Sequence, residues 1–121
     1  MRAFRSFLLA LALAMSVASA AYAHAFLDHA EPAVGSTVPA PPTEVRLWFT
    51  QELEPAFSTV RVLNERGQRV DREDNGVDRK DPTQLRVRVS PLGPGLYKVV
   101  WRVVSIDTHV SEGDFTFRVG P

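Results

Sequence analysis

The sequence predicts a small all-β domain, an antiparallel Greek-key sandwich of about seven short strands. Proline, glycine and polar residues recur at intervals of roughly ten residues, as the turns between short strands do. Between these turns, apolar and polar residues alternate with the period of two that is typical of half-buried strands. No stretch after residue 23 has a sustained helical period. An open β-barrel is the competing architecture.

The first 23 residues have the pattern of a secretory signal peptide. Arg2 and Arg5 precede an apolar run over residues 7–18, and Ala21-Tyr22-Ala23 fits a signal-peptidase site. The apolar run is shorter than the ~20 residues that are needed to cross a bilayer. We therefore expect cleavage after Ala23, export to the periplasm and a mature domain of residues 24–121 that is not inserted in the membrane.

The first half of the mature chain contains three predicted extended segments. Residues 25–30 form the first and end at a turn over residues 32–35. Residues 36–38 are short and extended, and the prolines within residues 39–42 exclude a helix or a central strand there. In residues 45–50, Val, Leu and Phe alternate with Arg, Trp and Thr, which predicts a half-buried strand.

The middle of the chain predicts a hairpin, a loop and a further strand. Residues 57–63 alternate between two faces, and a turn over residues 64–67 leads into residues 68–70 as the second arm of the hairpin. Residues 71–82 are charged and poor in apolar side chains, so we expect a solvated loop. Residues 85–89 alternate again and form a strand.

The last two predicted strands cover residues 96–106, which form the longest β run, and residues 115–119. The longest run places Tyr97, Val99, Trp101 and Val103 on one face. Tyr97 follows a glycine-containing turn, which is the position of the tyrosine corner in Greek-key sandwiches, although ordinary core packing explains a tyrosine there equally well.

Composition excludes several classes of function. Without Arg2 and Arg5, 12 basic side chains face 14 acidic ones, which gives no basic surface for nucleic acid or for an anionic membrane. The absence of cysteine excludes disulfides and thiolate metal sites, and the only methionines, Met1 and Met15, lie in the signal segment. We expect a monomeric domain that is held together by packing alone.

Two features of the mature chain could bind a metal ion. His24 would become the N-terminal residue, so its α-amine and ring Nδ1 could close one chelate ring. The amine has an unperturbed pKa of about 7.7–8.0, so its neutral form is available near neutral pH. In Asp107-Thr108-His109, a spacing of two places a carboxylate and an imidazole on the same side of an extended segment. Taken singly, each feature is more often incidental.

Strand order brings the two features together. In an up-and-down or Greek-key sandwich, the first strand starts at the end of the domain where the sixth strand finishes, so the loop over residues 107–113 should lie near His24. An amine, two imidazoles and a carboxylate suit the tetragonal geometry of Cu(II), and they suit Ni(II) and Zn(II) less well. Cu(I) prefers sulfur ligands. The sequence therefore predicts a Cu(II) site with His24, Asp107 and His109 as ligands.

The remaining histidine and the two tryptophans are expected to be structural. Regular alternation along residues 25–30 would place Leu27 and His29 on the face opposite His24, so we expect His29 at the surface and outside the site. Trp48 and Trp101 are expected in the core or on a sheet face.

The order and spacing of several short motifs resemble the CopC family of periplasmic copper-binding proteins over essentially the whole mature chain. The most specific motif is Val104-Ser105-Ile106-Asp107-Thr108-His109-Val110-Ser111. The others are His24-Ala25, Glu31-Pro32-Ala33 with Gly35-Ser36, Val45-Arg46-Leu47-Trp48-Phe49-Thr50, Gly95-Leu96-Tyr97-Lys98-Val99-Val100-Trp101, Gly113 and Phe115-Thr116-Phe117.

This resemblance implies an immunoglobulin-like or cupredoxin-like β fold and a Cu(II) site made by the amine and ring of His24, Asp107 and His109. The methionine-rich loop of members that also bind Cu(I) is missing, so the chain looks like the Cu(II)-only type. Such proteins often have an outer-shell glutamate where this chain has Gln51, followed by Glu52, and outer-shell groups tune affinity. The resemblance also implies copper import or resistance, with an inner-membrane copper transporter as partner.

Two other functions are compatible with the same residues. The first is an oxygen-activating copper enzyme with a histidine brace, although Asp107 as a ligand would occupy an equatorial position that oxygen chemistry needs. The second is an exported interaction module that binds no metal. The leading interpretation is a copper carrier or buffer that is not an enzyme.

Overall fold

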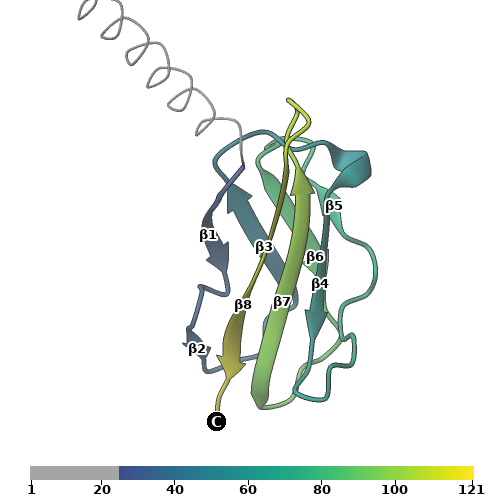
Figure 1. Ribbon diagram of the computed structural model, residues 1–121. Coiled ribbons are helices and arrows are strands. Elements are labelled where there is room, and N and C mark those ends of the chain that lie inside the picture. The colour runs from purple at the N-terminus through teal and green to yellow at the C-terminus, as the bar shows by residue number, and fades with distance from the viewer. Residues whose placement is uncertain (1–24) are drawn as a thin grey trace, which may run out of the picture.

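The computed structural model describes residues 25–121, in which eight strands form two four-stranded sheets (Figure 1). One sheet has the order β1-β3-β6-β5 and the other the order β2-β8-β7-β4. The strands are β1 (Leu27–Glu31), β2 (Thr37–Val38), β3 (Glu44–Phe49), β4 (Thr59–Leu63), β5 (Gly76–Val77), β6 (Gln84–Arg88), β7 (Gly95–Val104) and β8 (Val110–Val119). A single 3₁₀ turn, η1 (Pro55–Phe57), precedes β4 within these residues.

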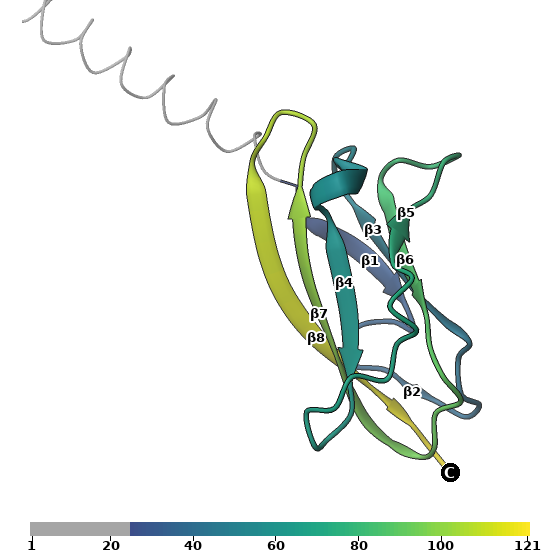
Figure 2. The ribbon, with the colours of Figure 1, turned by 90° about the vertical axis from the view of Figure 1, so that its right-hand side faces the viewer.

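The two sheets pack face to face as two separate layers (Figure 2). Alternate residues of each strand point into the space between the layers, as the period of two requires. The core therefore contains the side chains predicted for the buried faces, including Val45, Leu47, Val60, Val99 and Phe117. The all-β sandwich is confirmed, because the strands of residues 25–121 form two separate sheets and do not close into a single barrel.

The strand count and one pairing differ from the prediction. Residues 25–121 contain eight strands instead of seven, because Gly76–Val77 pairs with β6 inside the segment expected to be a loop. Two-residue strands of this kind are too short to leave an alternation pattern. In addition, β2 pairs with β8 in parallel, so the sandwich is not antiparallel throughout.

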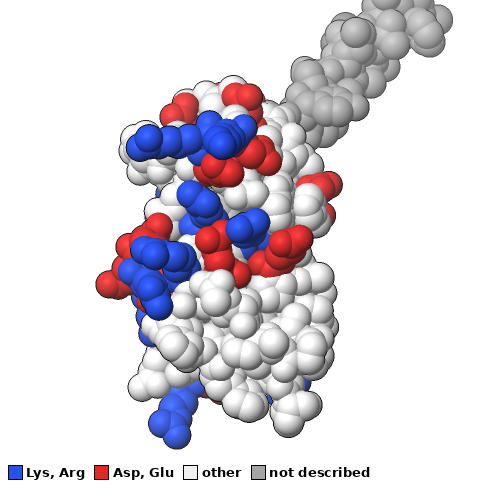
Figure 3. Space-filling view, turned by 180° about the vertical axis from the view of Figure 1, so that it is seen from behind, with Lys and Arg blue, Asp and Glu red and all other residues white. Residues whose placement is uncertain are grey.

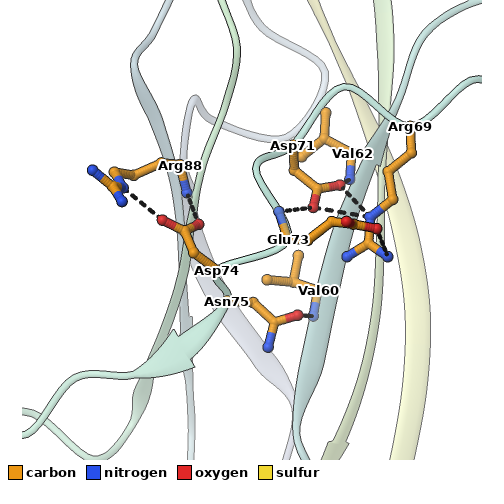
Figure 4. A network of polar contacts seen from close by, with 8 residues as sticks. All are labelled: Val60, Val62, Arg69, Asp71, Glu73, Asp74, Asn75 and Arg88. Carbon is orange, nitrogen blue, oxygen red and sulfur yellow. Dashed lines mark hydrogen bonds and ion pairs between the residues drawn. The ribbon is translucent and has the colours of Figure 1, made fainter.

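The charged segment after Val70 protects the exposed edge of β4 (Figure 4). Asp71 Oδ1 accepts a hydrogen bond from the Val62 amide at 2.8 Å, and Asn75 Oδ1 accepts one from the Val60 amide at 3.4 Å. Asp71 is buried, and Arg69 Nε lies 2.9 Å from its Oδ2. The expectation of a fully solvated loop is therefore wrong at this point, because unpaired amides of an edge strand need acceptors and these side chains provide them.

Tyr97 connects the turn before β7 to the core. Its hydroxyl donates a hydrogen bond of 2.7 Å to the carbonyl of Gly93, and its ring stacks on Phe117 at a centroid distance of 5.6 Å. The hydroxyl therefore ties to the backbone four residues upstream, as in a tyrosine corner. The sequence leaves two explanations open for Tyr97, a tyrosine corner and core packing. The structure supports both of them.

A bulge interrupts β1. Its register against β3 shifts between Leu27 and His29, so the alternation of faces is broken there. As a result, Ala25 and Ala30 are both buried although they are five positions apart, a spacing that regular alternation would place on opposite faces. Leu27 packs against the core, whereas His29 is exposed. The expectation that Leu27 and His29 share a face is wrong for this reason.

The outer face of the β1-β3-β6-β5 sheet carries intermixed charges (Figure 3). Arg46 pairs with Glu44 and Arg88 pairs with Asp74, so neighbouring side chains neutralise one another. The paired charges on this face therefore create no extended electrostatic field of a single sign.

Candidate metal centre

The start of β1 and the end of β7 meet at one end of the sandwich, as both ribbon views show (Figures 1 and 2). Residues 50–54 form hydrogen bonds with both of these segments. The Phe26 amide donates to Thr50 Oγ1 at 2.9 Å and the Thr50 amide donates to the Phe26 carbonyl at 2.8 Å. A few residues later, the Ile106 amide donates to the Glu52 carbonyl at 3.1 Å. The first strand therefore starts at the end of the domain where β7 finishes, as strand order predicts.

Residues 105–109 form a tight, hydrogen-bonded turn between β7 and β8. The Ser105 amide donates to the His109 carbonyl at 3.0 Å, and the Thr108 amide donates to the Ser105 carbonyl at 2.8 Å. Thr108 has a φ of 71°, in the left-handed region that non-glycine residues seldom adopt. Such a conformation persists only where the surrounding contacts fix it, so the turn presents its side chains in a defined arrangement.

Asp107 and His109 face each other across this turn. Asp107 Oδ1 lies 3.4 Å from His109 Nδ1, and the two side chains are 46% and 44% exposed. The sequence predicts that they point to the same side because the segment is extended, whereas the structure brings them together through the left-handed Thr108. The pairing is as expected, but the backbone conformation that produces it is different.

The electrostatics of the turn favour an anionic Asp107. The hydroxyl of Ser105 donates a short hydrogen bond to Asp107 Oδ1 and lowers the pKa of that carboxyl. Desolvation opposes this effect, and the neighbouring His109 reinforces it. A metal-binding carboxylate has to be deprotonated, so the environment of Asp107 suits a ligand.

His24, the proposed first ligand, lies outside the described residues. Ala25, to which it is bonded, is completely buried at this end of the sandwich and belongs to the core. Gln51 is partly buried and Glu52 is exposed in the connecting segment. The backbone carbonyl of Glu52 accepts the hydrogen bond from the Ile106 amide in the turn.

His29 lies elsewhere, on the outer face of the β1-β3-β6-β5 sheet. Its ring stacks on Trp48 at 4.4 Å with an interplanar angle of 8°, and its Nδ1 donates to Asp28 Oδ2 at 2.6 Å. Trp101 contacts Phe49 edge-on at 5.1 Å in the core. The positions expected of these three residues, at the surface for His29 and in the core or on a sheet face for Trp48 and Trp101, are confirmed.

The described residues alone do not make a complete metal site. In residues 25–121, no three side chains of His, Cys, Asp or Glu gather closely enough to hold an ion. Asp107 and His109 offer one oxygen and one nitrogen donor, half of the four-donor set that the sequence predicts. Any site built on this pair therefore needs donors from His24 or from another molecule.

Two features of this end did not emerge from sequence reasoning. One is Ser105, a buried serine whose hydroxyl contacts both Asp107 and His109; its position at the end of the alternating pattern of β7 could have revealed it. The other is a set of exposed apolar side chains on the segments that lie at this end of the sandwich. We call this set the apolar rim; it consists of Phe26, Phe57, Ile106 and Val110. Exposed apolar residues are common, so no sequence signal singles these out.

Comparison with known proteins identifies the family. Residues 27–120 match the CopC domain. The chain belongs to the CopC family. Copper resistance protein C of Pseudomonas syringae pv. tomato is 35% identical over 120 residues, and the match covers 94% of both chains.

Two solved CopC-family structures share the fold. CopC from Methylosinus trichosporium OB3b superposes with a TM-score of 0.72 at 34% identity, over 81% of this chain and 95% of that one. PcoC, a methionine-rich copper resistance protein from Escherichia coli, superposes with a TM-score of 0.69 at 31% identity, over 80% and 99% of the two chains. The family indicated by the sequence motifs is therefore confirmed.

Between residues 25 and 121 there is no helix whose length and apolar character would allow it to cross a membrane.

Proposed function

We propose that this CopC-family protein is exported, loses residues 1–23 and binds Cu(II) in the periplasm as a copper carrier or buffer. The ligands would be the amine and ring of His24, the carboxylate of Asp107 and the ring of His109. The observation that carries the proposal is the Asp107–His109 pair, held 3.4 Å apart at the end of the sandwich where the buried Ala25 anchors the start of the domain.

The donor set favours Cu(II) over the alternatives. Three nitrogens and one oxygen suit the tetragonal geometry of Cu(II), which also heads the affinity order of the divalent metals. PcoC is described as methionine-rich, whereas this chain has no methionine after Met15 and no cysteine. Because Cu(I) prefers sulfur ligands, this difference supports a site that is specific for Cu(II).

The experiment that tests this function compares two forms of the mature protein. One begins at His24 and the other carries one extra residue before it, so that the α-amine becomes a peptide nitrogen. We expect the extension to lower Cu(II) affinity by several orders of magnitude, because it destroys one chelate ring, and to change the EPR spectrum. Equal affinities for the two forms would contradict the proposed site.

The competing functions predict different results. A histidine-brace enzyme would produce peroxide from oxygen and a reductant, or oxidise a substrate, well above the rate of free copper. The carboxylate of Asp107 next to His109 argues against this function, because it would occupy an equatorial position on the metal. A metal-free interaction module would bind Cu(II) weakly and would not respond to changes at His24.

The apolar rim supports the proposal that a copper transporter of the inner membrane is the partner. Its four side chains are exposed, and the segments that carry them lie at the same end of the sandwich as the turn with Asp107 and His109 (Figures 1 and 2), so a protein that takes up copper there would lie close to them. Contiguous exposed apolar residues are typical of interaction sites. A carrier that docks with one partner at a time needs no self-association, which fits the expected monomer.

The transporter proposal can be tested by placing a charge in the rim. We expect Ile106→Glu to slow copper transfer from the loaded protein to inner-membrane vesicles of the native host about tenfold, since a desolvated charge without a partner costs roughly 1–3 kcal/mol. Val34, which is equally exposed but lies in the turn after β1, provides the matched control Val34→Glu. Cu(II) affinity should be unchanged in both variants. Equal transfer rates for the two variants would count against docking through the rim.

A further inference from the structure

Ser105 is an unusual residue for its position. It continues the inward-facing series of β7 after Val99, Trp101 and Val103, and its exposed fraction is 0%. A buried hydroxyl is unfavourable unless it forms hydrogen bonds. An alanine would fill this position in the core without that requirement, so the contacts of the hydroxyl indicate why a serine stands there.

The hydroxyl of Ser105 contacts both predicted ligand residues of the turn. It donates its single proton to Asp107 Oδ1, and one of its lone pairs accepts the amide proton of His109 at 3.2 Å. The His109 carbonyl, 3.4 Å from the hydroxyl, is already engaged by the Ser105 amide at 3.0 Å. One buried atom thus fixes the carboxylate of Asp107 and the backbone of His109 at the same time.

We propose that Ser105 is a positioning residue for the Cu(II) site. Its hydroxyl sets the orientation of the Asp107 carboxylate and keeps the His109 backbone at a fixed distance from it, so that both donors are arranged before the metal arrives. This inference rests on the proposed function, because it assigns a role in a site formed by Asp107 and His109. Groups that orient metal ligands through hydrogen bonds have a measurable effect on affinity.

The chain contains a matched control in Ser58. Its side chain is also buried, with an exposed fraction of 1%, and its hydroxyl lies 3.2 Å from the amide and 3.4 Å from the carbonyl of Val104, the residue next to Ser105. Ser58 therefore resembles Ser105 in burial, chemistry and location. Its hydrogen bonds go to the backbone of β7 and not to Asp107 or His109.

The test uses Ser105→Ala and Ser58→Ala in the mature protein that begins at His24. We expect Ser105→Ala to weaken Cu(II) binding roughly 10- to 100-fold, as the loss of an outer hydrogen-bond partner typically does, and to change the EPR spectrum. Ser58→Ala should lower the unfolding temperature to a similar extent but leave the affinity and the EPR spectrum unchanged. A merely structural role for Ser105 predicts that both variants behave like Ser58→Ala, and that result would overturn the inference.

A second measurement needs no metal. In the metal-free protein, the His109 amide should exchange its hydrogen slowly, and Ser105→Ala should accelerate that exchange while Ser58→Ala should not. Ser105→Thr retains the hydroxyl and should keep an affinity closer to the unmodified protein than to Ser105→Ala. If the unmodified protein fails to bind Cu(II), the proposed function is wrong. If it binds but Ser105→Ala binds equally well with the same EPR spectrum, only the role of Ser105 is wrong.

Discussion

At the scale of single residues, the two described histidines provide a direct comparison. His109 faces Asp107 at the end of the sandwich, whereas His29 is stacked on Trp48 and bonded to Asp28 on a sheet face. We expect His109→Ala to weaken Cu(II) binding markedly, although less than an N-terminal extension does, because the chelate of His24 survives. His29→Ala should leave the affinity unchanged. Titration of both variants, followed by EPR, checks this; similar losses in both would contradict the assignment.

The residue types of the site could be read from the sequence, but their arrangement could not. Asp107-Thr108-His109 and the N-terminal His24 carry recognisable chemistry, and strand order predicts that they converge. The left-handed Thr108 and the two contacts of the Ser105 hydroxyl depend on three-dimensional packing at the end of β7. A period-two pattern specifies which face a side chain takes, and it says nothing about such local turns.

At the scale of elements, the close pairing of β7 and β8 depends on a glycine. A Cβ at Gly113 would lie 2.4 Å from Cζ2 of Trp101, whose ring is buried against Phe49. We expect Gly113→Ala to destabilise the domain by about 1–3 kcal/mol, as overpacking does. Gly76→Ala is the control, since a Cβ there meets no atom within 4 Å. Urea unfolding followed by tryptophan fluorescence measures both; equal stabilities would show that Trp101 can move aside.

The buried carboxylate of Asp71 stabilises the edge of β4. Its contribution to the free energy of unfolding therefore depends on pH. Burial alone would raise the pKa of Asp71, but hydrogen bonds from Arg69 and from the amides of Val62 and Glu73 outweigh burial and lower it. The folded state therefore binds the proton less readily than the unfolded state. The stabilisation is fully present above the unfolded pKa of about 3.9 and is lost as the pH falls through the lower folded value.

We therefore expect Asp71→Ala to reduce the free energy of unfolding at pH 7 by about 2 kcal/mol, the scale of hydrogen bonds to a buried charged group. The difference from the unmodified protein should shrink as the pH falls well below 4. Asp74→Ala, which removes the partner of Arg88 at the surface (Figure 4), should have a much smaller effect. Urea unfolding at several pH values measures all three proteins. A difference for Asp71→Ala that stays constant down to acid pH would contradict this account.

At the scale of the whole molecule, the sequence was sufficient for the fold class and for most strands, because alternation and turn residues act locally. The errors occur where a long-range contact decides the local structure. The bulge in β1 follows from pairing with β3, and β5 exists because Gly76 and Val77 lie beside β6. The burial of Asp71 follows from the unpaired amides of an edge strand. None of these partners is adjacent in the sequence, so a local pattern cannot reveal them.

Copper binding should also stabilise the molecule as a whole. A metal shared by His24, Asp107 and His109 would link the start of β1 to the turn between β7 and β8, elements that unfolding separates. At a free Cu(II) concentration of 100 times Kd, binding to the folded state alone adds about 2.7 kcal/mol, which for a domain of this size raises Tm by roughly 10 °C or more. Thermal unfolding with and without Cu(II) measures the shift. The form with one extra N-terminal residue should show little of it at the same concentration, and an identical shift in both forms would mean that copper binds elsewhere.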